Sequence, residues 1–234
     1  MSKQILILNG SPRIHGNTAA LIDAFTAGAE AAGHTITRFD LAALDIRGCR
    51  GCLGGGRDPR HPCVQRDGMD AVYPAYMAAD VVVLASPMYY WSISGQLKCA
   101  FDRLFAVAEL GPDLANPVKD AVLLMAAEGD TEENFAPVRA YYKALLDCLG
   151  WKDAGIVYAA ETWPPGISRP IRSSWRPPGN WARRCDARPD VALTRTRTGA
   201  GASLCFRVRG DIMQPSKPNA VGNHDAARRF CFHD

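Results

Sequence analysis

The sequence predicts an α/β fold in which helices cover both faces of a five-stranded parallel β-sheet. Three observations support this prediction. Short apolar runs alternate along residues 1–160 with longer segments whose apolar residues recur at helical spacing. The clearest run, Val-Val-Val-Leu-Ala at 81–85, is continuously apolar, as expected of a strand buried on both sides. The 47% share of hydrophobic residues in the 234-residue chain is large enough for a full core.

Residues 4–78 are predicted to form two strands and two helices. Gln4–Asn9 is a short apolar run that ends at a Gly-Ser-Pro turn, which is typical of a buried parallel strand. The segment after Asn17 has apolar residues at helical spacing, and Gly33 is a suitable stop. The stretches that follow predict a strand over 34–39, a loop rich in Gly, Arg, Pro and Cys over 48–68, and a helix over 70–78.

Residues 80–160 are predicted to complete the sheet. The central strand covers 80–85, and Leu97, Phe101 and Leu104 are spaced for one face of a helix over 94–107. A strand over 120–126, a long helix over 131–149 and a strand over 154–160 follow. Five strands joined in this way favour the order 2-1-3-4-5, and ligands of such sheets bind beyond the carboxyl ends of the strands, where the order reverses.

The loop after the first strand is suited to binding a phosphate. The start of a helix supplies backbone N–H groups and a partial positive charge, and Ser and Thr hydroxyls and an Asn amide add donors. Gly16 lets the backbone come close, and Arg13 offsets the dianionic charge. The predicted phosphate-binding residues are Ser11, Arg13, Gly16, Asn17 and Thr18. The alternative is an ordinary helix cap made by the same Ser, Asn and Thr residues.

Other nucleotide motifs are missing from the sequence. Neither a Walker A motif nor Gly-x-Gly-x-x-Gly is present, so folds that bind ATP or a dinucleotide are disfavoured.

The loop after the third strand reads Pro-Met-Tyr-Tyr-Trp at 87–91. A flat, largely apolar ring with polar edges, such as the isoalloxazine of a flavin, needs aromatic or Met surface of this kind. The alternative is a hydrophobic corner beneath the next helix.

Together these motifs resemble the NAD(P)H-dependent FMN reductase family, in the branch that includes iron–sulfur flavoproteins. The resemblance covers about residues 4–167 and rests on the segments 10–18, 87–91 and 95–103. It implies a flavodoxin-like fold, FMN as the cofactor and NAD(P)H as the co-substrate. By resemblance, contacts to the ring and ribityl chain come from Pro87, Met88, Tyr89, Tyr90 and Trp91.

The end of the fourth strand is expected to make room for the edge of the flavin. Relatives carry small residues there, and this chain has Ala127 and Gly129, which we expect beside the cofactor. Glu128 departs from the family pattern, and its side chain is expected to face water.

The expected function is an FMN-dependent NAD(P)H oxidoreductase that transfers two electrons to a quinone, a nitro or azo compound, or a flavin. NAD(P)H and the small-molecule acceptor are expected to bind one after the other at the same site beside the flavin. No catalytic acid or base is identified, although Tyr89 or Tyr90 can donate a hydrogen bond. The alternative is a flavodoxin-like electron-transfer protein without turnover of its own. Such carriers are strongly acidic, whereas residues 1–166 carry 14 Lys and Arg against 19 Asp and Glu.

Three cysteines in the predicted loop form an incomplete cluster motif. Cys49 and Cys52 begin the Cys-x-x-Cys-x-x-Cys pattern of the iron–sulfur branch, but Gly55 takes the third position and Cys63 follows later. The three thiols could hold a labile cluster, bind zinc with a fourth ligand such as His61, or bind no metal and act as a redox-active pair. We favour the absence of a metal, and we expect the loop over the flavin edge or at a subunit contact.

Residues 168–234 differ in character from the predicted flavodoxin-like domain of residues 1–167. From 167 onward the chain carries 13 Lys and Arg against 5 Asp, with no Glu. One permitted back-translation of 171–185, read one base earlier, gives an amphipathic helix like the last element of the family. We therefore predict that this basic, Arg- and Pro-rich extension is poorly ordered and arose by a frameshift. The alternative is a basic arm that binds nucleic acid.

Other features of the sequence predict location and assembly. No run of about 18 apolar residues is present, and the apolar stretch after Met1 is too short for a signal peptide. We therefore expect a cytoplasmic protein that contacts neither membrane nor nucleic acid. The family resemblance implies a homodimer, to which the aromatic loop at 87–91 is suited.

Overall fold

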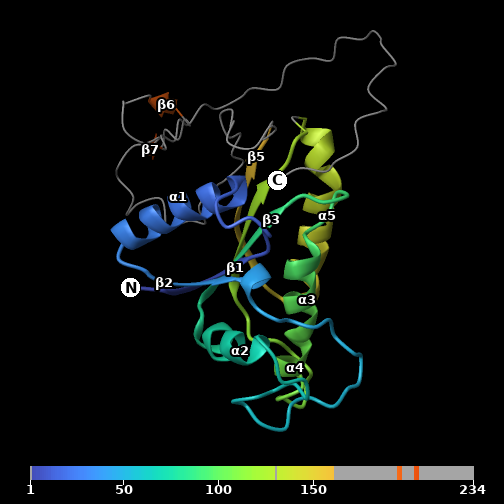
Figure 1. The fold of residues 1–234 in the computed structure, drawn as a ribbon. Helices are drawn as coiled ribbons and strands as arrows, with labels where there is room; N and C mark the ends of the chain where they lie inside the picture. Colours follow the sequence, from blue (N-terminus) through green and yellow to red (C-terminus); the bar gives the residue numbers. More distant parts are fainter. Residues whose placement is uncertain (1, 130, 161–193, 197–202, 206–234) are drawn as a thin grey trace, which may run out of the picture.

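A computed structural model describes residues 2–129, 131–160, 194–196 and 203–205 (Figure 1). The predicted five-stranded parallel sheet and its strand order are confirmed, because neighbouring strands run β2-β1-β3-β4-β5. Every pairing in this sheet is parallel. The strands are β1 (Gln4–Asn9), β2 (Thr35–Asp40), β3 (Val81–Pro87), β4 (Asp120–Ala126) and β5 (Lys152–Ala159).

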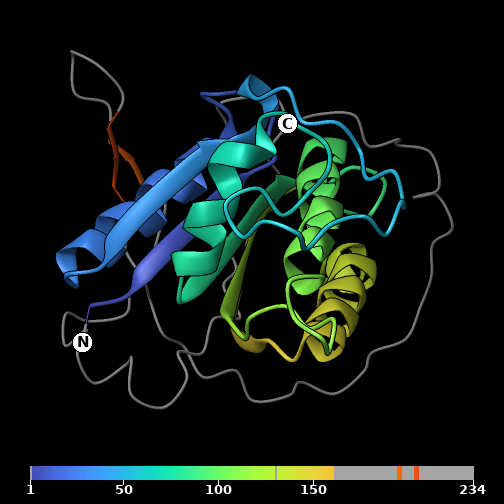
Figure 2. The same ribbon diagram turned by 90° about the horizontal axis from the view of Figure 1, so that it is seen from below.

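Helices cover the sheet from both sides (Figures 1 and 2). Helix α1 packs on one face, where Leu21 and Ile22 join the apolar side chains of β1, β3 and β4. Helices α2, α3 and α5 pack on the other face, which holds the larger of the two cores. The helices are α1 (Asn17–Ala31), the short 3-10 helix η1 (Leu41–Ala43), α2 (Met69–Ala78), α3 (Gly95–Arg103), α4 (Phe105–Ala108) and α5 (Glu132–Leu149).

The helix predicted over 94–107 is divided at Leu104. The Leu104 N–H donates to the Phe101 carbonyl at 3.0 Å, and the Val107 N–H donates to the Leu104 carbonyl at 3.0 Å, so the chain tightens to three-residue spacing. The Arg103 carbonyl meanwhile accepts a hydrogen bond from the Tyr73 hydroxyl at 3.3 Å. A tertiary contact thus takes a backbone group that a continuous helix would use.

Strand β5 begins two residues earlier than predicted and contains a β-bulge. Ala121 pairs with Asp153 and Val122 with Gly155, so Ala154 is the extra residue. Gly155 has a φ of 139°, which favours glycine. Because β5 lies at the edge of the sheet, the bulge interrupts the regular row of edge hydrogen-bonding groups.

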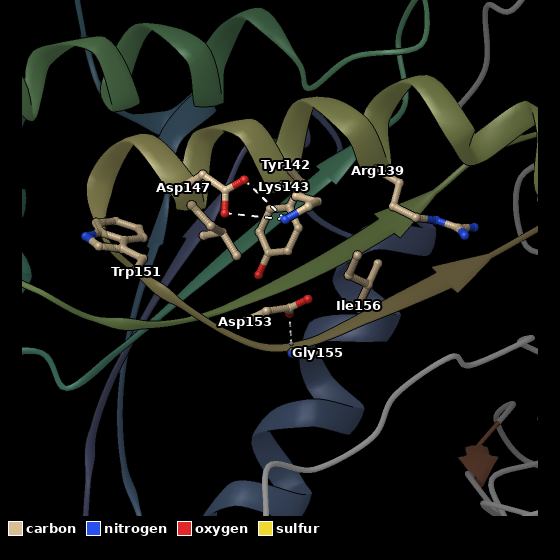
Figure 3. Close-up of a pocket in the computed structure, with 9 residues that line it drawn as sticks. Arg139, Tyr142, Lys143, Asp147, Trp151, Asp153, Gly155 and Ile156 are labelled. Atoms are coloured by element: carbon tan, nitrogen blue, oxygen red, sulfur yellow. Dashed lines mark hydrogen bonds and ion pairs between the residues drawn. The ribbon is translucent and has the colours of Figure 1, made fainter.

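A groove of about 420 Å³ lies between α5 and the first half of β5 (Figure 3). The Tyr142 hydroxyl points from α5 toward Asp153 and, in the described part of the chain, has no hydrogen-bond partner. Burial raises the pKa of Tyr142, and the nearby Asp153 carboxylate raises it further. The groove is lined by Arg139, Tyr142, Lys143, Leu146, Asp147, Trp151, Asp153, Gly155 and Ile156.

Most of the predicted extension from residue 168 lies outside the described residues. Two short strands within it, β6 (Thr194–Thr196) and β7 (Ser203–Cys205), pair in antiparallel orientation and were not predicted. The boundary at 167/168 and the frameshift origin remain predictions. Among the described residues, no helix has the length and apolar character needed to span a membrane.

Candidate functional site

The loops that follow β1, β3 and β4 meet at one edge of the sheet. The Gly10 N–H donates to the Ala85 carbonyl of β3 at 2.8 Å. The Met88 N–H donates to the Ala126 carbonyl of β4, also at 2.8 Å. These bonds continue the parallel ladders past the strand ends, so the predicted phosphate and aromatic loops lie side by side. This is the edge at which the strand order reverses, between β1 and β3.

A polar network fixes the loop after β1. The buried Asn9 donates through Nδ2 to Asp40 at 2.8 Å and accepts at Oδ1 from the Ser11 N–H at 3.0 Å. The Arg38 guanidinium in turn donates to Asp40 at 2.8 Å. The Ser11 hydroxyl then accepts from the Arg13 N–H at 3.1 Å. Asn9 therefore ties the turn to the end of β2, which holds the backbone before any ligand binds.

The predicted phosphate-binding residues gather around the start of α1. Gly16 is the N-cap residue, and the first turn of α1 contains no acidic side chain. The side chains of Ser11, Asn17 and Thr18 are buried, whereas Arg13 is exposed. A helix start whose cap residue has no side chain and whose first turn carries no carboxylate suits a dianionic phosphate.

Ser94 joins the first loop to the third strand and to α3. Its hydroxyl donates to the Gly10 carbonyl at 2.7 Å and accepts from the Leu97 N–H at 3.3 Å as the N-cap of α3. The Ser94 N–H donates to Ser86 Oγ at 2.8 Å. A Cβ on Gly10 would lie 2.5 Å from Ser94 Oγ, so a glycine is required for this close approach.

We expect Ser94→Ala to lower the free energy of unfolding by about 1–1.5 kcal/mol, because it removes a helix cap and leaves the Gly10 carbonyl without its donor. Urea unfolding followed by circular dichroism would measure the change. Ser92→Ala, two residues earlier, is the matched control and should change stability by less than about 0.5 kcal/mol. An equal loss in both variants would contradict this role for Ser94.

Residues 89–92 form a tight turn that presents two aromatic side chains. The backbones of Tyr89 and Ser92 exchange hydrogen bonds of 3.0 Å in both directions. Tyr90 and Trp91 between them have φ values of 48° and 60°, a pair of left-handed residues typical of a type I′ turn. Their side chains are 57% and 46% exposed. A strained, exposed aromatic pair of this kind is typical of a functional site.

Three of the predicted contact residues are buried and do not add to the exposed surface of the site. Met88 is 4% exposed and its side chain packs in the larger core, so it adds little exposed surface to the loop, and its contact with the ring stays a prediction. Strand β3 continues to Pro87, and Met88 follows it directly. Pro87 and Ala127 are buried as well. Tyr90 and Trp91 therefore supply the exposed aromatic surface, next to the half-buried Tyr89.

The loop after β4 is joined to the aromatic turn by a residue that the sequence did not single out. Trp91 Nε1 donates to Asn134 Oδ1 at 3.2 Å, which links the turn to the first turn of α5. Thr131 caps this helix by accepting from the Asn134 N–H at 3.2 Å. A Cβ on Gly129 would overlap the Asn134 side-chain amide, so Gly129 allows the amide to lie against the loop backbone.

The cysteine loop is anchored at the other end of α3. Arg103, the last residue of α3, forms a buried ion pair with Asp67 at 2.7 Å and donates through Nε to Cys63 Sγ at 3.2 Å. The Gly55 N–H donates to Glu109, just after α4, at 3.1 Å. Ser94 and Arg103 are nine residues apart, so these anchors lie roughly 13 Å along the helix from the aromatic turn.

The residues of this loop do not fit a four-thiolate iron–sulfur cluster. Cys49, Cys52 and Cys63 are the three cysteines it contains. A Cβ at Gly55, the third motif position, would overlap the Glu109 carboxylate, so a cysteine there would need the loop to move. In the described part of the chain, no three His, Cys, Asp or Glu side chains are grouped as metal ligands.

Sequence patterns identified the loops but not the residues that join them. Asn9, Ser94 and Asn134 are polar residues at strand or helix ends, where they are read as ordinary caps. The signal that could have identified Asn9 is its polarity at the end of an apolar strand. Asn134 gives no such signal, because its partner Trp91 lies 43 residues earlier.

Comparison with known proteins identifies a family model that matches residues 4–160, described as NADPH-dependent FMN reductase. An iron–sulfur flavoprotein of Archaeoglobus fulgidus is 31% identical over 141 residues, which cover 60% of this chain and 61% of that protein. An FMN-dependent NADH:quinone oxidoreductase of Shewanella amazonensis is 30% identical over 178 residues, covering 68% of this chain and 87% of that protein.

A solved structure of an NAD(P)H:quinone oxidoreductase from Methanothermobacter marburgensis has the same fold, with a TM-score of 0.58 and 20% identity. The match covers 71% of this chain and 87% of that one. The chain spans somewhat less than two thirds of the length of three iron–sulfur flavoproteins that it matches.

Proposed function

Because the chain belongs to the NADPH-dependent FMN reductase family, we propose that it is an FMN-dependent oxidoreductase that passes electrons from NADH or NADPH to a small acceptor. The observation that carries this proposal is the convergence of the loops after β1, β3 and β4 at the edge where the strand order reverses. One loop suits a phosphate, the second offers aromatic surface, and the third brings a glycine backbone against which α5 places a buried amide donor.

The residues present fit FMN. Two features of the structure support this fit: the start of α1 without a carboxylate in its first turn, and the Asn134 Nδ2 atom, which is buried without an acceptor among the described residues. When bound, FMN supplies the capacity to accept and donate a pair of electrons. The helix start and Arg13 would hold the phosphate, while Tyr89, Tyr90 and Trp91 would cover the ring and exclude water.

The acceptor that we propose is a quinone, with nitro and azo compounds and free flavin as further candidates. The name of the Shewanella relative supports the quinone. A flat acceptor suits an open aromatic surface, on which Tyr90 and Trp91 remain about half exposed. A homodimer and a cytoplasmic location remain predictions, the first supported by the exposed aromatic turn.

The proposal is tested by titrating the purified full-length protein with FMN and by following NADH and NADPH oxidation with menadione as the acceptor. We expect quenching of flavin fluorescence on binding and steady turnover. FMN binding without turnover would favour the electron-carrier alternative. A protein that binds no FMN would refute the proposal.

Reversing the charge at Arg13 tests the phosphate end of the site. We expect Arg13→Glu to weaken FMN binding by about tenfold, because a carboxylate would replace a cation near the dianionic phosphate. Lys143→Glu is the matched control, since Lys143 is also exposed and the net charge changes equally. Its FMN dissociation constant should stay within about twofold of that of the unmodified protein. Equal effects of the two variants would contradict a phosphate at α1.

A further inference from the structure

Asn134 carries a buried donor that has no acceptor among the described residues. Its Nδ2 atom is shielded from solvent, and none of the described residues offers it a hydrogen-bond acceptor. A buried amide donor left unpaired costs about 1–3 kcal/mol, so such groups are rare unless a ligand pairs with them. The atom therefore needs an explanation beyond the packing of α5.

The orientation of this amide is set by Trp91. An indole N–H can only donate, so the Asn134 atom that receives it at 3.2 Å must be the carbonyl oxygen Oδ1. The NH₂ group consequently faces away from the indole. The Asn134 backbone is fixed as well, since its N–H donates to Thr131 Oγ1 at 3.2 Å.

The position of the amide is set by Gly129. A Cβ at Gly129 would overlap both Nδ2 and Cγ of Asn134, so the NH₂ group lies directly against the backbone of the loop after β4. This loop ends the strand that pairs with β3, and the Met88 N–H bonds to its Ala126 carbonyl at 2.8 Å. The unpaired donor therefore lies between the aromatic turn and the loop expected beside the ring.

We propose that Asn134 Nδ2 donates a hydrogen bond to a carbonyl oxygen on the rim of the flavin ring, and that Trp91 positions the amide for this role. The inference rests on the proposed binding of FMN and assigns it a contact residue on α5. A ring carbonyl is the acceptor class that fits, because it is neutral, planar and part of the ring that the aromatic turn would cover.

The proposed contact has a consequence for the electron affinity of the cofactor. Reduction increases the negative charge on the carbonyl oxygens of the ring, so a fixed donor there stabilises the reduced form more than the oxidised form. Loss of the donor should weaken FMN binding and also move the two-electron midpoint potential of the bound flavin to more negative values.

The test compares Asn134→Leu and Asn134→Asp with the unmodified full-length protein. Leu keeps a similar volume but removes the amide, whereas Asp keeps the oxygen that receives the Trp91 indole and removes the donor. We expect both variants to raise the FMN dissociation constant by about five- to tenfold, measured by fluorescence quenching. The midpoint potential, measured by equilibration with redox dyes, should fall in both.

The Asp variant distinguishes two roles of Asn134: donating a hydrogen bond to the flavin, or only linking α5 to the turn that contains Trp91. If Asn134 only holds the Trp91 turn, Asn134→Asp will bind FMN as tightly as the unmodified protein, and the inference is overturned. Glu133→Leu is the matched control. Glu133 is exposed on the same turn of α5, and its side chain is replaced by leucine, as in Asn134→Leu. It should leave the dissociation constant within about twofold.

The outcome also separates this inference from the proposed function. An unmodified protein that binds no FMN would defeat the proposed function and the inference with it. An unmodified protein that binds FMN, together with unchanged affinity and potential in both Asn134 variants, would defeat the inference alone.

Discussion

Replacing Arg103 by Met is expected to lower the free energy of unfolding by about 3–5 kcal/mol, the largest loss that the structure predicts for a single side chain. The Arg103 and Asp67 side chains are both fully buried, and two hydrogen bonds of 2.7 and 3.2 Å join them. Met would fill much of the same volume but would remove the closest cation from the buried Asp67 carboxylate, leaving it the longer ion pair with the more exposed Arg47 at 3.7 Å.

The loss extends beyond the ion pair. The Arg103 guanidinium also donates to the carbonyls of Arg47 at 2.8 Å and Gln65 at 3.2 Å, and to Cys63 Sγ. It thus fastens both ends of the long loop between β2 and α2. We expect the variant to be cleaved within this loop by a dilute protease under conditions that leave the unmodified protein intact.

The effect should depend on pH in a defined direction. Burial raises the pKa of Asp67, but hydrogen bonds from Arg103 and from the Met69 and Arg47 N–H groups outweigh it, so the pKa is lowered below its usual 3.8. A carboxyl whose pKa is lower in the folded state stabilises the fold above pH 3.8, and this contribution is lost as the pH falls through the lowered value. The stability gap between Arg103→Met and the unmodified protein should therefore narrow under acid conditions.

Urea unfolding of both proteins at neutral and acid pH would measure this prediction. Lys98→Met is the matched control on the same helix, because Lys98 pairs with Asp102 on the exposed surface and such pairs contribute less than about 1 kcal/mol. A loss for Arg103→Met no greater than that of the control would show that the buried pair does not organise the loop.

The double variant Tyr90→Gly/Trp91→Gly is expected to weaken FMN binding by about a hundredfold and yet leave the protein as stable or slightly more stable. Each aromatic ring would cover the flavin, and its loss should cost about tenfold in affinity. Both residues have positive φ, where glycine avoids a strain of about 1–2 kcal/mol per residue, partly offset by its greater entropy when unfolded.

Leu114 provides the control, because it is one of two other exposed residues with positive φ. Leu53 and Leu114 also have positive φ, at 49° and 51°, and their side chains are exposed. Leu114→Gly should relieve similar strain without any effect on the FMN dissociation constant. Thermal unfolding and FMN titration of all variants would measure the two effects. Loss of stability without loss of affinity in the double variant would mean that the turn supports the fold rather than the cofactor.

The sequence by itself determined the fold class, the strand order and the three loops at the site. Each depends on a local property: the spacing of apolar residues identifies strands and helices, and a Gly-Ser-Pro turn before a helix identifies a phosphate loop. The parallel arrangement then places the loops after β1, β3 and β4 at one edge, because parallel strands end on the same side. The burial of Met88 was not predicted, because sequence spacing does not give the exact end of a strand.

The tertiary structure alone decided how these loops are held together. The Trp91–Asn134 contact spans 43 positions and the Arg103–Asp67 pair spans 36, and neither leaves a periodic trace in the sequence. In the sequence, Arg103 is one residue of a motif shared with the family, and Asp67 is a loop residue outside any motif. Pairings of this kind depend on which side chains face each other once the helices have packed, a condition set by the whole core rather than by neighbouring residues.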